Sequence, residues 1–172
     1  MPVSVKFNHV GITVSNLERS VEFYKDAFGL EPGMVFDITA GPEVAASLDL
    51  AEHHQRVALI PIGPVVLELI EMDPASPRTP TQDEIGYTYI SFEVDDLDQV
   101  HARLAAKGYK WNSQPVNASD HKPVADTKYC ILKDPDGKNI EIMQVGPGLA
   151  TSEIQAAADA GASLDNPYVI GS

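Results

Sequence analysis

Four polar side chains occupy matching places in the two halves of the 172-residue chain. His9 stands 80 residues before Tyr89, and Glu68 stands 73 residues before Glu141. Each glutamate interrupts an apolar run, VVLELI or NIEIM, where a carboxylate is costly to bury unless it is paired or bound to a metal ion. An imidazole and two carboxylates suit zinc, nickel, cobalt, manganese or iron, so we predict one divalent ion held by His9, Glu68 and Glu141.

Taken singly, each of these residues has a simpler interpretation. A lone histidine or glutamate on a strand usually has a structural role or faces solvent, and Tyr89 alone would be a packing residue. Their joint placement at equivalent positions of a repeat favours the functional interpretation over the structural one.

Hydrophobic periodicity predicts the elements that must position these side chains. Residues 7–14 alternate as a strand that places His9 opposite an aliphatic face, and a helix over 16–28 follows and ends at Gly29. The other predicted elements of the first half are a strand and a short helix within 33–52, broken at Gly41-Pro42, and strands over 56–62 and 65–71.

After a proline-rich linker at 73–85, the same pattern begins again. Its predicted elements are a strand over 87–94, a helix over 96–107, and strands over 109–116, 127–134 and 138–144. Each half therefore reads β-α-β-β-β, and the short connections favour antiparallel pairing within each sheet. The predicted fold class is α+β: paired β-α-β-β-β modules, over 5–72 and 86–145, forming a cup-shaped mixed sheet in which the four polar side chains converge. An Ala/Gly-rich tail, 146–172, lies outside the repeat.

Composition removes several classes of function. The net charge of −13, without a cluster of lysine and arginine, disfavours binding to nucleic acid or to an anionic membrane surface. Because no apolar run reaches the roughly 18 residues of a spanning helix, and no signal-peptide pattern is present, we expect a cytoplasmic protein. The single cysteine, Cys130, excludes an intrachain disulfide framework, and we expect it to be a small buried hydrophobe.

Three segments carry a resemblance to a known family. The resemblance is to the vicinal oxygen chelate superfamily and extends over residues 7–144. It is carried by HVGITVSNLERSVEFYKDAFGLEP, VVLELIE and DPDGKNIEIMQ. That group includes glyoxalase I, methylmalonyl-CoA epimerase, extradiol dioxygenases, fosfomycin-resistance enzymes and bleomycin-binding proteins. The resemblance implies that His9, Glu68 and Glu141 match the metal ligands of the family and that the chain forms a homodimer. It is informative about the fold more than about the reaction, because this scaffold hosts many chemistries.

Tyr89 departs from the family pattern, since metal-dependent members commonly have histidine there. A neutral phenol has a reference pKa of about 10 and is a poor ligand near pH 7. A bound cation could make Tyr89 a phenolate ligand; otherwise this residue could act as an acid or base, or form a wall of the pocket. The missing histidine argues against the two-histidine, one-carboxylate iron site of extradiol dioxygenases.

The resulting hypothesis is a divalent-metal-dependent lyase, isomerase or epimerase that acts on a small substrate with vicinal oxygens. The ion would stabilise an enolate or enediolate after proton abstraction by Glu68, Glu141 or Tyr89. One alternative is a metal-free small-molecule binding protein of the bleomycin-resistance type, which would use Tyr89, Trp111 and Tyr129 for stacking. Another alternative is a dioxygenase with an unusual ligand set.

Further candidates for substrate contact lie outside the metal-ligand set. His121 and Lys122 fall in a long loop that tends to cover the site in this family, where His121 could also replace the missing ligand. Arg56 and Lys128 could hold an anionic group of the substrate, although salt bridges are the expected role of both. His101, on the second predicted helix, is expected to be solvated.

Overall fold

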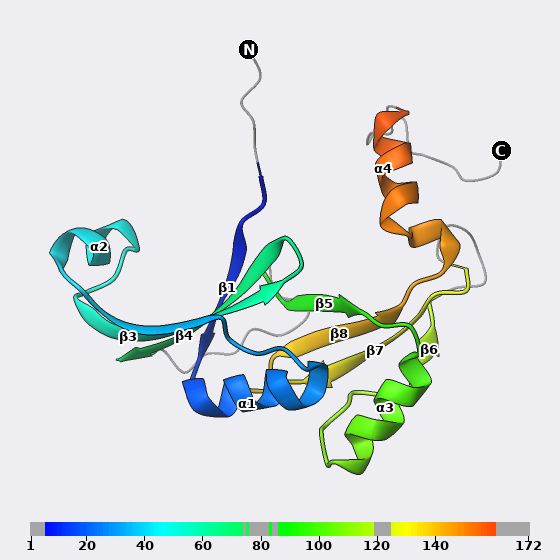
Figure 1. Ribbon diagram of the computed structural model, residues 1–172, viewed down its shortest axis with the longest axis horizontal. Coiled ribbons are helices and arrows are strands. Elements are labelled where there is room, and N and C mark those ends of the chain that lie inside the picture. Colours follow the sequence, from blue (N-terminus) through cyan, green and yellow to red (C-terminus); the bar gives the residue numbers. More distant parts are fainter. Residues whose placement is uncertain (1–5, 74, 76–82, 84–85, 119–124, 161–172) are drawn as a thin grey trace. The chain divides into compact units, whose positions relative to one another are not determined.

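The computed structural model describes residues 6–73, 75, 83, 86–118 and 125–160 of the chain (Figure 1). His121 and Lys122, and most of the predicted linker, lie outside the described residues. The chain divides into two compact units: unit 1 is residues 1–79 with the turn Asp134–Gly137, and unit 2 is residues 80–133 and 138–172. Within the described part, no helix is long and apolar enough to cross a membrane.

Unit 1 holds a four-stranded sheet with strand order β1-β4-β3-β2. Its elements are β1 (His9–Val14), α1 (Leu17–Phe28), β2 (Met34–Ala40), α2 (Pro42–Ser47), β3 (His53–Ile62) and β4 (Val65–Asp73). The predicted break at Gly41-Pro42 separates β2 from α2 as expected. Gly29 ends α1 in the left-handed conformation with φ of 70°, as a glycine cap does.

Unit 2 repeats this arrangement with strand order β5-β8-β7-β6. Its elements are β5 (Tyr89–Glu93), α3 (Leu97–Ala106), β6 (Val116–Asn117), β7 (Lys128–Lys133), β8 (Asn139–Gln144), a 3-10 turn (Pro147–Leu149) and α4 (Thr151–Asp159). The predicted α+β class, with two mixed sheets built from β-α-β-β-β modules, is confirmed.

The expectation of antiparallel pairing throughout each sheet is wrong for two strand pairs. The pairs β1–β4 and β5–β8 are parallel, and the other strand pairs are antiparallel. In unit 1, α1 returns the chain so that β2 runs in the direction of β1, and two hairpins then leave β4 in that direction. The strand that pairs with β1 is therefore the parallel strand β4, and β2, to which α1 connects β1, lies at the opposite edge of the sheet.

The strand predicted over 109–116 is reduced to the short β6. The backbone of 110–112 does follow β7, because the N–H of Asn112 donates to the carbonyl of Ile131 and Trp111 forms an isolated bridge with Leu132. Pro115 then interrupts the ladder, since it has no N–H to donate.

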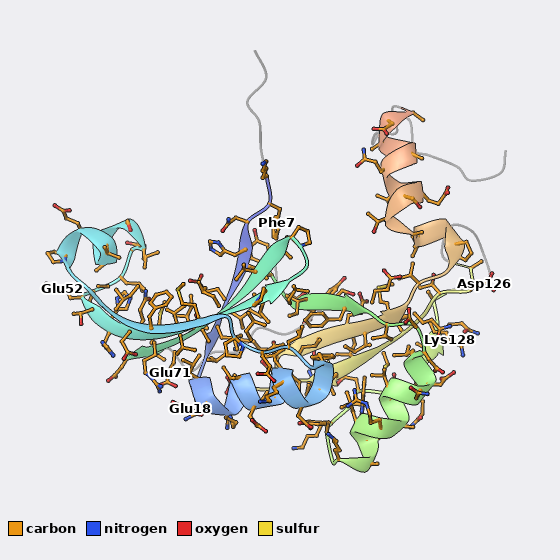
Figure 2. The ribbon with its side chains drawn as sticks, viewed as in Figure 1. Phe7, Glu18, Glu52, Glu71, Asp126 and Lys128 are labelled. Carbon is orange, nitrogen blue, oxygen red and sulfur yellow. The ribbon has the colours of Figure 1, made fainter. Side chains whose placement is uncertain are left out.

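The start of α1 is tied to the last strand of its own module. The side chain of Asn16 caps the helix, and the N–H of Leu17 donates to Oε2 of Glu71 on β4 at 2.5 Å. Arg56, opposite Glu71 on β3, pairs with Glu18 in the first turn of α1 and lies 3.8 Å from a Glu71 oxygen. Glu18 and Glu71 are labelled together at this helix end in Figure 2. Two otherwise unpaired N–H groups of the helix are thereby satisfied.

The start of α3 is held in the same way in unit 2. The side chain of Asp96 caps the helix, and the N–H of Leu97 donates to Oε1 of Gln144 on β8 at 3.1 Å. Lys128, opposite Gln144 on β7, donates to Asp98 in the first turn of the helix at 2.7 Å. The salt-bridge roles expected of Lys128 and Arg56 are therefore confirmed.

These contacts show which face of each sheet the helix covers. Glu71 and Gln144 lie three residues after Glu68 and Glu141 on the same strands, and side chains an odd number apart on a strand point to opposite faces. The helices cover the faces that carry Glu71 and Gln144. Glu68 and Glu141 consequently lie on the opposite face of their sheets, which we call the open face of each unit.

Replacing Glu71 tests this arrangement. Glu71→Ala is expected to lower the free energy of unfolding by about 1–2 kcal/mol, because the N–H of Leu17 would lose its acceptor. Glu71→Gln should cost clearly less, since its amide oxygen can accept the same N–H, as Gln144 does in unit 2. Urea denaturation followed by circular dichroism measures both variants. Equal losses for Ala and Gln would contradict the capping role.

Candidate functional site

His9 and Glu68 lie together on the open face of unit 1. Nε2 of His9 is 3.5 Å from Oε2 of Glu68, and the two side chains are 51% and 23% exposed. The parallel register of β1 and β4 explains this proximity, because Gly11 stands opposite Glu68 and His9 is two residues earlier on the same strand. The structure thus brings two of the three predicted ligands into one accessible pair.

Asn8 orients the imidazole ring of His9. Oδ1 of Asn8 is 2.7 Å from Nδ1 of His9, and because an amide oxygen can only accept, Nδ1 carries the hydrogen. In the neutral ring this leaves the Nε2 lone pair beside the Glu68 carboxylate. Metal-ligating histidines are commonly held through their other nitrogen in this way. Sequence reasoning did not identify Asn8, since an asparagine before a histidine is not a signal by itself.

The space beside the Glu68 carboxylate is kept free by a glycine. A Cβ at Gly11 would lie 3.4 Å from Oε2 of Glu68 and 3.6 Å from Cδ1 of Ile70. Tetrahedral bonds from one ion to an imidazole nitrogen and a carboxylate oxygen place these atoms about 3.3 Å apart. The separation of 3.5 Å between His9 and Glu68 is close to this value. Donor types, spacing and room therefore fit a divalent ion.

Glu141 and Tyr89 lie on the open face of unit 2. Ser91 stands opposite Glu141 in the parallel β5–β8 pair, and Tyr89 is two residues earlier on β5. This is the same register that relates Gly11 to Glu68 in unit 1. The 80-residue and 73-residue offsets read from the sequence therefore correspond to equivalent positions in the two sheets.

Three more residues share this face: Tyr129, which the sequence analysis named as a candidate, and Asn139 and Lys133, which it did not. Asn139 on β8 stands opposite Tyr89 on β5 and, on its other side, opposite Lys133 on β7. The Nζ of Lys133 donates to Oδ1 of Asn139. Tyr129 also lies on this face, two residues before Ile131, which stands opposite Glu141. Asn139 and Lys133 resemble ordinary surface residues in the sequence, and only the register of β7 and β8 places them beside Tyr89.

Trp111 and His101 lie on the α3 side of this sheet. Trp111 bridges Leu132, which is buried on the face opposite Glu141, and the Trp111 ring centroid is 4.6 Å from that of His101. The expectation that His101 is solvated is wrong, because the indole ring and the sheet bury it. This position gives Trp111 a packing role against α3, and we leave it out of the proposed pocket.

Cys130 provides no reactive thiol. Its side chain is buried in β7, as predicted, and burial together with the nearby Asp98 charge raises the pKa of the thiol to about 12. The thiolate, which is the nucleophile and the metal ligand, is therefore absent at neutral pH.

The described part of the chain does not hold a complete ligand set within one unit. No group of three or more His, Cys, Asp or Glu side chains among the described residues is placed to bind a metal ion. His9 and Glu68 are two donors of unit 1, and Glu141 belongs to unit 2. An ion at His9 and Glu68 would therefore need water, or a protein ligand from outside unit 1.

Comparisons with known proteins agree with this architecture. The family model described as Glyoxalase/Bleomycin resistance protein/Dioxygenase superfamily matches residues 6–142. A 2-epi-5-epi-valiolone epimerase from Actinomyces is 29% identical over 86% of this chain and 84% of its own, and the human mitochondrial methylmalonyl-CoA epimerase is 27% identical over 81% and 73%. The crystal structure of a glyoxalase family protein from Bacillus cereus has a TM-score of 0.69 with 20% identity, over 84% of this chain and 96% of that one.

Proposed function

We propose, because this chain belongs to the Glyoxalase/Bleomycin resistance protein/Dioxygenase superfamily, that it is a divalent-metal-dependent enzyme acting on a small substrate with vicinal oxygens. Its reaction would be that of a lyase, an isomerase or an epimerase, the last being the activity in the names of two relatives. The observation that carries the proposal is the His9–Glu68 pair, whose atoms have the spacing and orientation of two ligands of one ion.

The proposed ligands are His9, Glu68 and Glu141. Glu141 has the register position in its sheet that Glu68 has in unit 1, which supports its assignment. Two carboxylates brought beside a neutral imidazole repel one another, and a divalent cation offsets their charge. Nitrogen and oxygen donors suit zinc, nickel, cobalt, manganese or iron.

A bound divalent ion supplies Lewis acidity, which polarises a substrate carbonyl and makes hydrogen on the adjacent carbon more acidic. A side chain of this protein must then take that proton, and the candidates are the carboxylates of Glu68 and Glu141 and the phenolic oxygen of Tyr89. Returning the proton to the opposite side of the same carbon gives an epimer, and returning it to the neighbouring carbon gives an isomer. The polar pair Asn139–Lys133 beside Tyr89 would orient the substrate oxygens through hydrogen bonds.

A metal-free binding protein is the second candidate function. Tyr89 is 45% exposed and lies with Tyr129 on the open face of unit 2, where both rings could stack on a ligand. A dioxygenase is less well supported, because Tyr89 stands where the second histidine of such a site would be.

Metal-dependent thermal stabilisation separates these functions. For wild-type protein purified without chelators, at least one of the five divalent ions should raise the unfolding temperature, since an ion at 100 times its Kd stabilises the native state by about 2.7 kcal/mol. Glu68→Gln and Glu141→Gln should reduce this increase, because each removes one negative charge while keeping the side-chain shape. The matched control is Glu71→Gln, the same substitution on the helix side of β4, which should keep the full response.

The result for the wild type decides between the two functions. If no ion is retained and none alters the unfolding temperature, the enzyme proposal fails and the metal-free binder is favoured. Tyr89→Phe, analysed in the same way, removes only the hydroxyl group. A loss of metal affinity in Tyr89→Phe would identify a ligand, whereas unchanged affinity restricts Tyr89 to proton transfer or to the pocket wall.

We also propose that the chain is a homodimer. The proposed third ligand, Glu141, belongs to unit 2, and a second chain could supply it to the His9–Glu68 pair. Sedimentation at micromolar concentration should then show a species of twice 18.6 kDa. A single species of 18.6 kDa would contradict the dimer.

A further inference from the structure

The open face of unit 1 is apolar around the His9–Glu68 pair. Leu59 on β3 stands directly opposite Glu68, and Met34 on the edge strand β2 stands opposite Leu59, so the three side chains form one row across the sheet. The flanking open-face positions on β4 are Val66 and Ile70. Among all open-face positions of these four strands, Glu68 is the only acidic residue, and none is lysine or arginine.

The charged residues of this sheet lie on its other face. The strand register places four charged residues on the helix-covered side: Asp37, Arg56, Glu71 and Asp73. Arg56 is the single arginine or lysine of the four strands, and it is paired with Glu18 and with Asp37. No cation of these strands is therefore placed to meet an anionic group of a ligand near Glu68.

Some apolar side chains of the open face are accessible to a ligand, whereas others, such as Val57 on β3, are buried. Met34 is 58% exposed and Ile38, four residues further along β2, is 36% exposed. A sheet face that meets water is normally polar, and a contiguous exposed apolar surface usually marks a binding site. Because neighbouring strands lie about 4.8 Å apart, Leu59 is one strand from Glu68 and Met34 is two strands away. One aromatic ring of a molecule ligated beside Glu68 therefore reaches Leu59, and a substituent on that ring points toward Met34.

From this placement we infer that the part of the substrate next to its vicinal oxygens is uncharged and apolar, and that this part lies over Leu59 and points toward Met34. The inference rests on the proposed function, because it takes Glu68 as the ligand that anchors the oxygens. It places no charged group of the substrate over the open face of unit 1, because a carboxylate or phosphate there would lack a lysine or arginine partner on these strands. The substrate class is a hydroxycarbonyl or dicarbonyl compound with a hydrophobic substituent beside its oxygens.

Hydroxamates test this inference because they chelate metal ions through two neighbouring oxygens. The three probes are acetohydroxamate, benzohydroxamate and 4-carboxybenzohydroxamate, which share the chelating group and differ in the attached body. Calorimetry on zinc-loaded protein gives each Kd, corrected for the affinity of the probe for free zinc. Benzohydroxamate should bind at least about tenfold more tightly than acetohydroxamate, because it buries apolar surface, and similarly more tightly than the carboxylated probe.

Two lysine substitutions on adjacent residues provide the matched control. Met34→Lys adds a cation to the open face, and Val35→Lys adds one to the helix side of the same strand, where Val35 is 55% exposed. Because both side chains are exposed, both variants should fold. Met34→Lys should tighten binding of 4-carboxybenzohydroxamate at least about fivefold, whereas Val35→Lys should leave it unchanged.

The outcomes separate the inference from the function on which it rests. If wild-type protein binds the carboxylated probe as tightly as benzohydroxamate, or if the two lysine variants behave alike, the inference is overturned while metal-dependent binding stands. If Met34→Lys changes the oligomeric state instead of the probe preference, the face is an interface between copies and the inference is also overturned. If none of the probes binds in a zinc-dependent manner, the proposed function fails as well.

Discussion

Burial of one apolar face of each sheet under its helix leaves the other face open, and a hydrogen bond from the first N–H of the helix to the last strand of its module holds the helix there. Leu17 donates to Glu71 in unit 1, and Leu97 donates to Gln144 in unit 2. Each bond places the helix over one face of its sheet, so that the residue three positions earlier on the same strand must point to the other face. The exposure of Glu68 and Glu141 thus follows from the way in which the helices are attached.

The two units share this framework but differ in what their open faces carry. Unit 1 has His9 and Gly11 on its first strand and an apolar surface beyond Glu68, whereas unit 2 has Tyr89 and Ser91 and the polar pair Asn139–Lys133.

Much of the fold could be predicted because local patterns determine it. Alternation along residues 7–14 placed His9 opposite the helix-facing side chains, and Gly29 marked the end of α1. The parallel pairing of β1 with β4 was missed, because it depends on where the helical crossover returns the chain and not on any single connection. The proximity of His9 to Glu68 follows from that pairing, and the 80- and 73-residue offsets relate each of these residues to its equivalent in unit 2 rather than to one another.

The remaining errors concern contacts between residues that are distant in sequence. His101 looks like a surface residue on its helix until the bridge between Trp111 and Leu132 brings the indole ring against it. Asn139 and Lys133 acquire meaning only through the register of β7 and β8. Periodicity reports which face a residue occupies, but tertiary packing decides whether that face is covered.

We propose that Glu141 and His9 are ligands of one ion, and this proposal can be tested without knowing how the two units are arranged. X-ray absorption spectroscopy of zinc-loaded protein counts the imidazole ligands of the ion directly. Our account predicts one imidazole in the wild type, two in Glu141→His, and one in Glu71→His, whose new ring would lie on the helix side of its sheet. A single imidazole in Glu141→His, or zinc that fails to bind the wild type, would contradict it.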